Sequence, residues 1–316
     1  MGGGARLGQI IVMGFVHLHC HSQYSLLDGT ADPAALAARA AELGMPALAL
    51  TDTCNLYGAV TFYKACKSHG IKAIIGVELT VQPEGQTVAD PAGVDAGYQI
   101  ISLVESEAGY RNLCRLITAA IFDGMHYKPR VDLALIKEHR DGLIFLTGGR
   151  KGVFRDLETG RARFSALAEV LSPEQLFVEL QDQGLENQPS INALARKVAK
   201  EANYQTVVTN AVHYLYPQDS ATLDVLHAVS AGALLSLISS RPSTDQAWFK
   251  TEEEVTALFP DDVDAIARTV EIAARCDFHY DFDTYHFPAT TPPDVVDGVQ
   301  PDTDANWAYF FKAFPP

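Results

Sequence analysis

The sequence predicts an α/β fold built around a parallel sheet, and three observations support this class. Short strand-like runs alternate with helical patterns over most of the 316 residues, which is typical of β-α units around a parallel sheet. Hydrophobic residues make up 47% of the chain and charged residues 20%, an ordinary balance for a globular protein with a core. The length permits one large barrel, because (β/α) barrels commonly reach about 200–250 residues as a single domain.

Three β-α units are predicted at the start of the chain. The strands are expected at 15–21, 46–52 and 72–81, and the helices between them at 32–44 and 58–70. Asp32 is the predicted N-cap of the first helix, Pro33 its first residue, and Gly44 lies just past its end.

The pattern resumes after residues 82–98, which are rich in Gly, Pro, Asp and Ala and are predicted to be a surface excursion. Further strands are expected at 98–105, 143–148, 176–181 and 206–210, with helices at 109–124, 163–171 and 186–202. After about residue 217 only helical patterns follow, at 219–238, 251–259 and 261–276. Thr251 and Glu254 predict a capping box for the second of these.

Three regions are expected along the chain. Residues 1–13 are predicted to be an N-terminal extension without a structural role, and residues 14–285 to be the barrel domain with its helical end. Residues 286–316 contain the Pro-rich stretch TTPPD and are predicted to be a linker toward a further domain.

Charge and cysteine content exclude several classes of protein. The chain has 24 Lys and Arg against 39 Asp and Glu, a net charge of −15, so this segment is not expected to bind DNA directly. Its five cysteines show no C-x-x-C spacing, so neither a disulfide framework nor a zinc knuckle is predicted, and a reducing cytoplasm is expected. The sequence contains no apolar run of the roughly 20 residues that a membrane span needs.

Three histidines alternate along the first predicted strand, at His17, His19 and His21. Alternate side chains of a strand share a face and lie roughly 6.6 Å apart, from a rise of about 3.3 Å per residue. The plain alternative is an exposed strand whose histidines form local hydrogen bonds. At the C-terminal end of a barrel strand, an H-x-H pair is typical of a metal site, because barrels keep their chemistry at that mouth.

Three more side chains are placed to join this mouth. Asp28 follows the strand in an Asp-Gly pair, which is also a common turn. Glu78 lies inside an apolar strand and therefore needs a metal, an arginine or a hydrogen-bond network as its partner. His213 follows a late strand, and a capping or packing histidine is the alternative. We expect the mouth to gather His19, His21, Asp28, Glu78 and His213.

Several segments match one known family when they are taken together. They are HLHCHSQYSLLDG, AAELGMPALALTD, NLYGAVTFYKACK, GIKAIIGVEL, GYRNL and HYKPR. Over about residues 14–288 the chain resembles the PHP domain (polymerase and histidinol phosphatase domain) of the alpha subunit of bacterial DNA polymerase III. NLYGAV and FYKACK resemble the main replicative form more than the related error-prone polymerase.

The resemblance implies a distorted (β/α)7 TIM-like barrel with a helical C-terminal extension. In complete members its mouth binds up to three divalent metals, and the domain can act as a metal-dependent phosphoesterase, including a 3′–5′ exonuclease. Matched to the family pattern, the metal ligands kept here are His19, His21, Asp28, Glu78 and His213. The substituted positions are Thr53 and Gln99 for histidines, Gly149 for a cysteine, Gln183 for a nearby histidine and Ala211 for an aspartate.

These substitutions imply a weakened site. Adjacent metals share ligands, and hydrolysis needs one ion to activate water while its neighbour neutralises phosphate charge. The resemblance therefore implies a mouth that holds at most one divalent metal (Zn, Mn or Mg), at low occupancy, and that has lost catalysis.

Three functions are open at this point. The first is a non-catalytic scaffold that supports the polymerase core of the same parent chain and docks the separate exonuclease subunit, with DNA reached only through the parent protein. The second is an active metal-dependent phosphoesterase or 3′–5′ exonuclease. The third, a free-standing histidinol-phosphatase-like enzyme, does not account for the polymerase-like segments. The substituted ligands favour the first, and DNA synthesis itself, a nucleotidyl transfer at paired acidic residues, is expected beyond residue 316.

Overall fold

The computed structural model describes residues 14–82, 85, 87, 97–235 and 244–284. The predicted extension at 1–13 and linker at 286–316 lie outside these residues. The chain divides into one unit from Met1 to Phe278 and a second from His279 to Pro316. All helices and strands of the described segments belong to the first unit.

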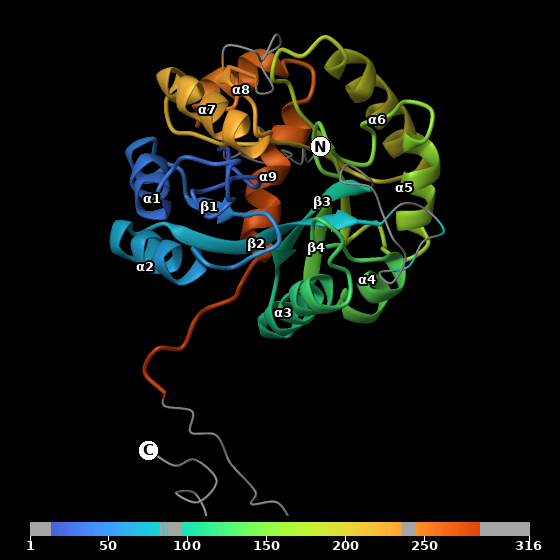
Figure 1. The fold of residues 1–316 in the computed structure, drawn as a ribbon, viewed down its shortest axis with the longest axis horizontal. Coiled ribbons are helices and arrows are strands. Elements are labelled where there is room, and N and C mark those ends of the chain that lie inside the picture. The colour runs from blue at the N-terminus through green and yellow to red at the C-terminus, as the bar shows by residue number, and fades with distance from the viewer. Residues whose placement is uncertain (1–13, 83–84, 86, 88–96, 236–243, 285–316) are drawn as a thin grey trace, which may run out of the picture. The chain divides into compact units, whose positions relative to one another are not determined.

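Six strands form one curled sheet in sequence order (Figure 1). They are β1 (Ala47–Leu50), β2 (Lys72–Val81), β3 (Tyr98–Val104), β4 (Leu143–Leu146), β5 (Leu176–Leu180) and β6 (Thr206–Val208). β1 pairs with β2, β4 with β5 and β5 with β6 in parallel, but β3 is antiparallel to both of its neighbours. The α/β class is confirmed, whereas the expectation of an entirely parallel sheet is wrong at β3. No helix is described between β2 and β3, and parallel pairing needs such a crossover.

The predicted first strand at 15–21 is extended backbone that lacks a regular ladder. On one side, Ala49 of β1 donates its N–H to the His17 carbonyl at 2.9 Å. On the other side, His21 donates its N–H to the Val212 carbonyl at 2.8 Å. The segment thus bridges β1 and the chain that follows β6, and it closes the sheet into a distorted barrel.

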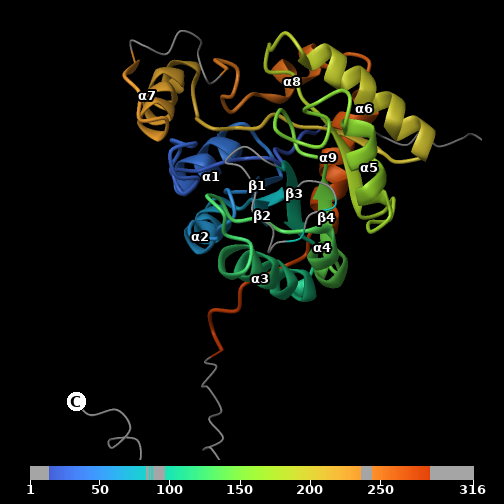
Figure 2. The same cartoon turned by 45° about the vertical axis from the view of Figure 1, so that its right-hand side comes forward.

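Helices surround the strands (Figures 1 and 2). They are α1 (Pro33–Glu42), α2 (Ala59–His69), α3 (Glu107–Phe122), α4 (Leu133–His139), α5 (Gly160–Ala168), α6 (Gln188–Ala202), α7 (Ser220–Ser230), α8 (Glu252–Leu258) and α9 (Val263–Arg275), with a 3-10 turn at Pro217–Asp219. α9 contacts β1 and β6, and its Ile272 and Ala273 join the buried core that the strands form. Within the described segments, no helix has both the length and the apolar character of a membrane span.

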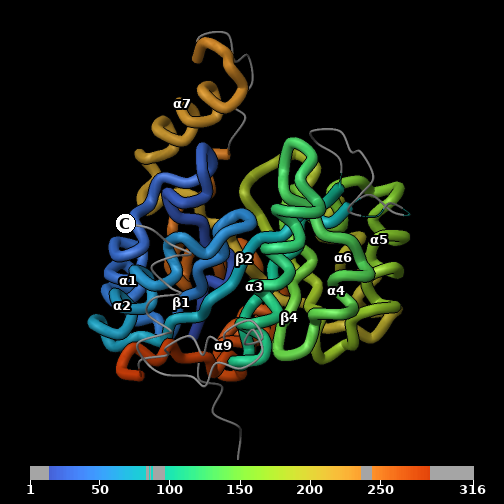
Figure 3. The backbone as a smooth tube through the Cα atoms, turned by 60° about the horizontal axis from the view of Figure 1, so that its bottom comes forward, coloured from blue at the N-terminus to red at the C-terminus, as the bar shows by residue number. Residues whose placement is uncertain are grey.

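Helix ends follow the local sequence. Asp32 caps α1 by accepting the Ala34 N–H at 2.8 Å, and the capping box predicted at Thr251 and Glu254 is present in α8. α7 ends at Ser230, earlier than the expected helix at 219–238, whose last residues lie outside the described part. Gly232 follows that end with φ +61°, a left-handed conformation that commonly terminates helices. α7 lies at the outer edge of its unit (Figure 3).

Candidate metal centre

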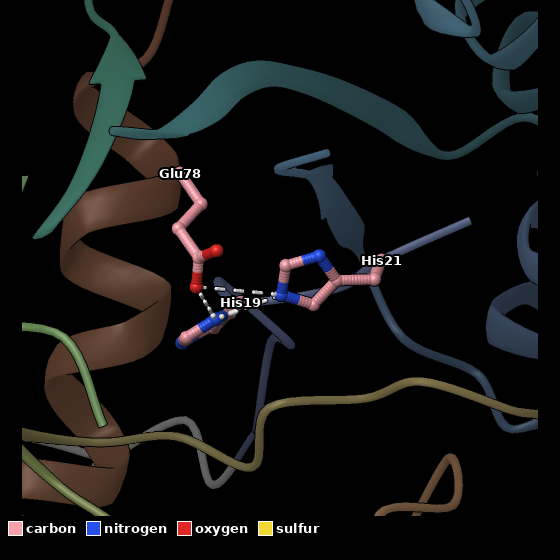
Figure 4. A group of neighbouring side chains, drawn as sticks. All are labelled: His19, His21 and Glu78. Atoms are coloured by element: carbon pink, nitrogen blue, oxygen red, sulfur yellow. Dashed lines mark hydrogen bonds and ion pairs between the residues drawn. The ribbon is translucent and has the colours of Figure 1, made fainter. Parts of the chain in front are cut away.

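Two histidines and a glutamate meet at the mouth of the barrel (Figure 4). His19 and His21 come from the segment that closes the barrel, and Glu78 comes from β2. His19 Nε2 and His21 Nε2 lie 3.2 Å apart. Glu78 Oε2 is 3.6 Å from His19 Nε2 and 3.7 Å from His21 Nε2. All three side chains are buried. One donor atom from each thus points to a common centre.

Hydrogen bonds hold the outer nitrogens of both imidazoles. His19 Nδ1 lies 2.8 Å from Glu179 Oε1, and because a carboxylate only accepts, this nitrogen carries a proton. His21 Nδ1 lies 2.9 Å from Ser25 Oγ, whose own proton goes to Asp52 Oδ1 at 2.6 Å. His21 Nδ1 is therefore a donor as well. Both Nε2 lone pairs face the centre of the site, where only a proton or a metal cation relieves their repulsion.

The charges of the site also favour a positive ion at its centre. Burial alone would lower the pKa of His19, but the charge of Glu179 and hydrogen bonds to Glu179 and Glu78 raise it to about 9. Burial and the charge of His213 lower the pKa of His21 to about 3. Burial alone would raise the pKa of Glu78, but the neighbouring imidazoles hold it at about 2. The charge of His21 contributes most to that lowering, followed by the hydrogen bond to His19 and its charge.

The three donor atoms fit a divalent metal. Zinc–ligand bonds of about 2.0–2.2 Å place the ligand atoms of a tetrahedral site about 3.3–3.6 Å apart. The separations of 3.2, 3.6 and 3.7 Å in this site are close to that range. Glu179 orients His19 from behind, as carboxylates commonly do for metal-binding histidines. Hence His19, His21 and Glu78 are the residues able to hold an ion.

Asp28 and His213 lie beside this group. The ring of His213 stacks on His21 with centroids 4.4 Å apart, and His213 Nδ1 donates to the backbone carbonyl of Asp28. The Asp28 carboxylate accepts from His227 Nε2 of α7 at 2.7 Å and lies 3.8 Å from Lys151 Nζ. The structure therefore brings the five predicted residues to one mouth, with Asp28 engaged by other side chains.

Two of the substituted positions contact Glu78 directly. Thr53 Oγ1 donates to Glu78 Oε1 at 3.1 Å, and Gln99 Nε2 donates to the same oxygen at 2.7 Å. Gln99 reaches the mouth because β3 is antiparallel, which places the start of this strand there. One carboxylate oxygen of Glu78 is thus occupied by protein donors.

The other three substituted positions line the same pocket. Gln183 Nε2 donates to the Ala211 carbonyl at 3.0 Å. A Cβ atom at Gly149 would lie 1.7 Å from Gln181 Oε1, so any larger residue at 149 would displace that amide. The cavity volume of this pocket is about 40 Å³, and one water needs about 10–15 Å³. The pocket accommodates a few waters or ions.

His17 departs from the expectation that three histidines share one face. It packs between Phe15 and Phe249, with ring centroids 4.8 and 4.3 Å away. Its Nε2 donates to the Lys250 carbonyl at 2.8 Å. His17 is a buried packing residue, because the segment 15–21 is not a regular strand.

Sequence reasoning missed Glu179, Lys151 and His227. Glu179 is an acid within the apolar strand LFVEL, which is the signal that singled out Glu78, so it could have been found. Lys151 and His227 lie in a glycine-rich turn and on an outer helix. The local sequence around neither residue indicates that its side chain reaches the barrel mouth.

The fold is a TIM-like barrel, and a buried His-His-Glu group lies at its mouth. Together these features are those of a barrel protein with a candidate metal site. Residues 17–183 match the family model of the PHP domain, and the chain belongs to this family. The resemblance found in the sequence is thereby confirmed.

The relatives that this chain matches are longer proteins. The chain is similar to DNA polymerase III subunit alpha of Treponema pallidum, at 39% identity over 84% of this chain and 23% of the relative. It is 36% identical to that of Escherichia coli, over 87% of this chain and 24% of the relative. The chain thus spans about a quarter of the length of these relatives. A distant structural likeness is a Bifidobacterium adolescentis protein assigned as a metal-dependent phosphoesterase, with TM-score 0.43 and 13% identity over 63% of this chain and 88% of that one.

Proposed function

We propose that this chain is the PHP domain of a bacterial replicative DNA polymerase III alpha subunit and acts as a non-catalytic scaffold. In this role it supports the polymerase core of the same parent chain and docks the separate proofreading exonuclease. DNA is then bound by the parent protein, since this segment has a net charge of −15. The similarity to alpha subunits from several bacteria supports the polymerase context.

The observation that supports the non-catalytic role is that protein donors already bind one carboxylate oxygen of Glu78. Its Oε1 accepts from Thr53 and Gln99, so only Oε2 remains directed at His19 and His21. That leaves three donor atoms for one ion. In two-metal sites that hydrolyse phosphoesters, one ion activates water and its neighbour neutralises the phosphate.

A bound divalent ion would supply Lewis acidity and a structural cross-link at this mouth. His19 and His21 would hold it from the segment that closes the barrel, and Glu78 from β2. Glu179 would keep His19 in the ligating tautomer, as its hydrogen bond to Nδ1 does here. This arrangement favours a stabilising role for the ion.

The second candidate function is a metal-dependent phosphoesterase or 3′–5′ exonuclease. The buried His-His-Glu group favours it, because its geometry fits a divalent ion. The two functions predict opposite outcomes in a single assay.

The test is hydrolysis by the purified chain with Mn²⁺, Zn²⁺ or Mg²⁺ supplied. The substrates are a primer labelled at its 3′ end and a chromogenic phosphodiester. We expect no hydrolysis above that of a His19→Ala control. Activity that is present in the unmodified chain and lost in the control would reverse the assignment and make the domain an exonuclease.

Docking is tested separately, by gel filtration of the chain mixed with the exonuclease subunit of the same organism. Co-elution at micromolar concentration is the expected result. The same experiment is repeated with the full-length alpha subunit in place of the chain. If the exonuclease subunit elutes separately from both proteins, the docking role is wrong.

A further inference from the structure

Both carboxylate oxygens of Asp28 are engaged by side chains of the protein. His227 Nε2 donates to Oδ1 at 2.7 Å, and Lys151 Nζ lies 3.8 Å from Oδ2. The backbone carbonyl of Asp28 accepts from His213 Nδ1. The Asp28 carboxylate at the edge of the metal site is thus held by Lys151 and His227, and the Asp28 backbone by His213.

The fold fixes the position of each donor. Lys151 follows β4, and its backbone carbonyl accepts the N–H of Gln99 at 2.9 Å, which ties this turn to the start of β3. His227 lies on α7, and its side chain is only 15% exposed. The Lys151 side chain is 48% exposed, but its charge acts on Asp28 and also on Glu78.

We propose that Lys151 and His227 restrict the mouth to one divalent ion by occupying Asp28. This inference rests on the proposed function, in which His19, His21 and Glu78 hold that ion. Lys151 and His227 are then residues that determine metal number, and they add to the effect of the substituted ligand positions.

The physical basis is competition for one carboxylate. A second ion bound to Asp28 would have to displace the His227 N–H, because a ligand oxygen lies within about 2.0–2.2 Å of its metal. This second ion would also lie close to the Lys151 ammonium, which is 3.8 Å from Asp28 Oδ2. Two positive charges that lie so close together repel each other. His213, which already contacts Asp28, would be the second ligand for such an ion.

The test is metal binding by the full chain, measured by calorimetric titration with Zn²⁺ or Mn²⁺ and by elemental analysis after gel filtration. Lys151→Met removes the charge, Lys151→Arg keeps it, and Lys137→Met changes the net charge at an exposed position outside the pocket. The double variant Lys151→Met with His227→Ala frees both oxygens of Asp28. Thermal melts establish that each variant is folded.

We expect one ion per unmodified chain, and an affinity for that ion about fivefold or more higher in Lys151→Met. Lys151→Arg and Lys137→Met should leave the affinity unchanged, and the double variant should bind a second ion. One ion in every variant with unchanged affinity would overturn the inference and leave the proposed function intact. No ion in any variant, or two ions in the unmodified chain, would overturn the one-ion assignment as well.

Discussion

His19 Nε2 and His21 Nε2 lie 3.2 Å apart while both Nδ1 atoms donate outward to fixed acceptors. Two unprotonated imidazole nitrogens at this distance repel each other, so a positive ion between them is required. A proton on His19 serves this need, in line with its pKa of about 9. A divalent metal serves it equally, with Glu78 as the third ligand.

Removing the charge behind His19 should weaken metal binding. Glu179→Gln keeps an acceptor for Nδ1 but removes the carboxylate that makes the imidazole a stronger ligand. We expect about tenfold weaker Zn²⁺ binding, the lower end of such effects, in a competition titration with a chromogenic chelator. Glu174→Gln, at a position outside the metal site, is the control, and equal affinities for both variants would contradict the assigned role of Glu179.

Restoring ligands should increase the number of bound ions. Thr53→His with Gln99→His and Ala211→Asp frees Glu78 Oε1 from its present donors and adds nitrogen and oxygen ligands around it. We expect at least one additional ion per chain in elemental analysis.

The matched control for this triple variant is Thr53→Val with Gln99→Leu, which frees the same oxygen without adding ligands. It should bind no additional ion. If the folded triple variant binds no more metal than the unmodified chain, then the substituted residues do not explain the reduced site.

Buried thiols should make the fold sensitive to alkali. Burial raises the pKa of Cys66 in α2 from 9.0 to about 12. Because the folded value is the higher one, this contribution to stability is complete below pH 9 and is lost as the pH rises toward 12. Between pH 9 and 10.5 the loss amounts to about 2 kcal/mol.

Denaturant unfolding of Cys66→Ala across this pH range checks the prediction. The variant should be less stable at pH 8, since the side chain is buried, but its stability should fall less steeply above pH 9. Cys114→Ala, at a partly exposed thiol, should change the slope less. Parallel pH profiles for the unmodified chain and Cys66→Ala would show that this thiol does not titrate differently on unfolding.

Much of the fold could be predicted because local patterns determine it. Strand β2 begins and ends at the predicted residues, and the caps at Asp32 and Thr251 follow from short-range hydrogen bonds. The antiparallel strand β3 could not be predicted, since periodicity reports exposure and not direction. The segment 15–21 has strand-like residues, yet it bonds two different neighbours and forms no regular ladder.

In the site, too, some residues are predictable from local sequence, whereas others depend on long-range contacts. His19 and His21 are predicted from the H-x-H pair at the end of a barrel strand, and Glu78 because a carboxylate inside an apolar strand needs a partner. The contacts of Asp28 with Lys151 and His227 join residues far apart in the sequence. Lys151 and His227 are each consistent with an ordinary surface residue in the sequence, so only the folded arrangement reveals their contact with Asp28.

The number of metal ions bound to the purified chain is the most direct test of a single metal site at the mouth. The sample is loaded with Zn²⁺ or Mn²⁺, passed through gel filtration and analysed for metal, beside His19→Ala and His21→Ala. We expect one ion per unmodified chain and none in either variant. Two or three ions in the unmodified chain, or an ion that both variants retain, would contradict a single site formed by His19, His21 and Glu78.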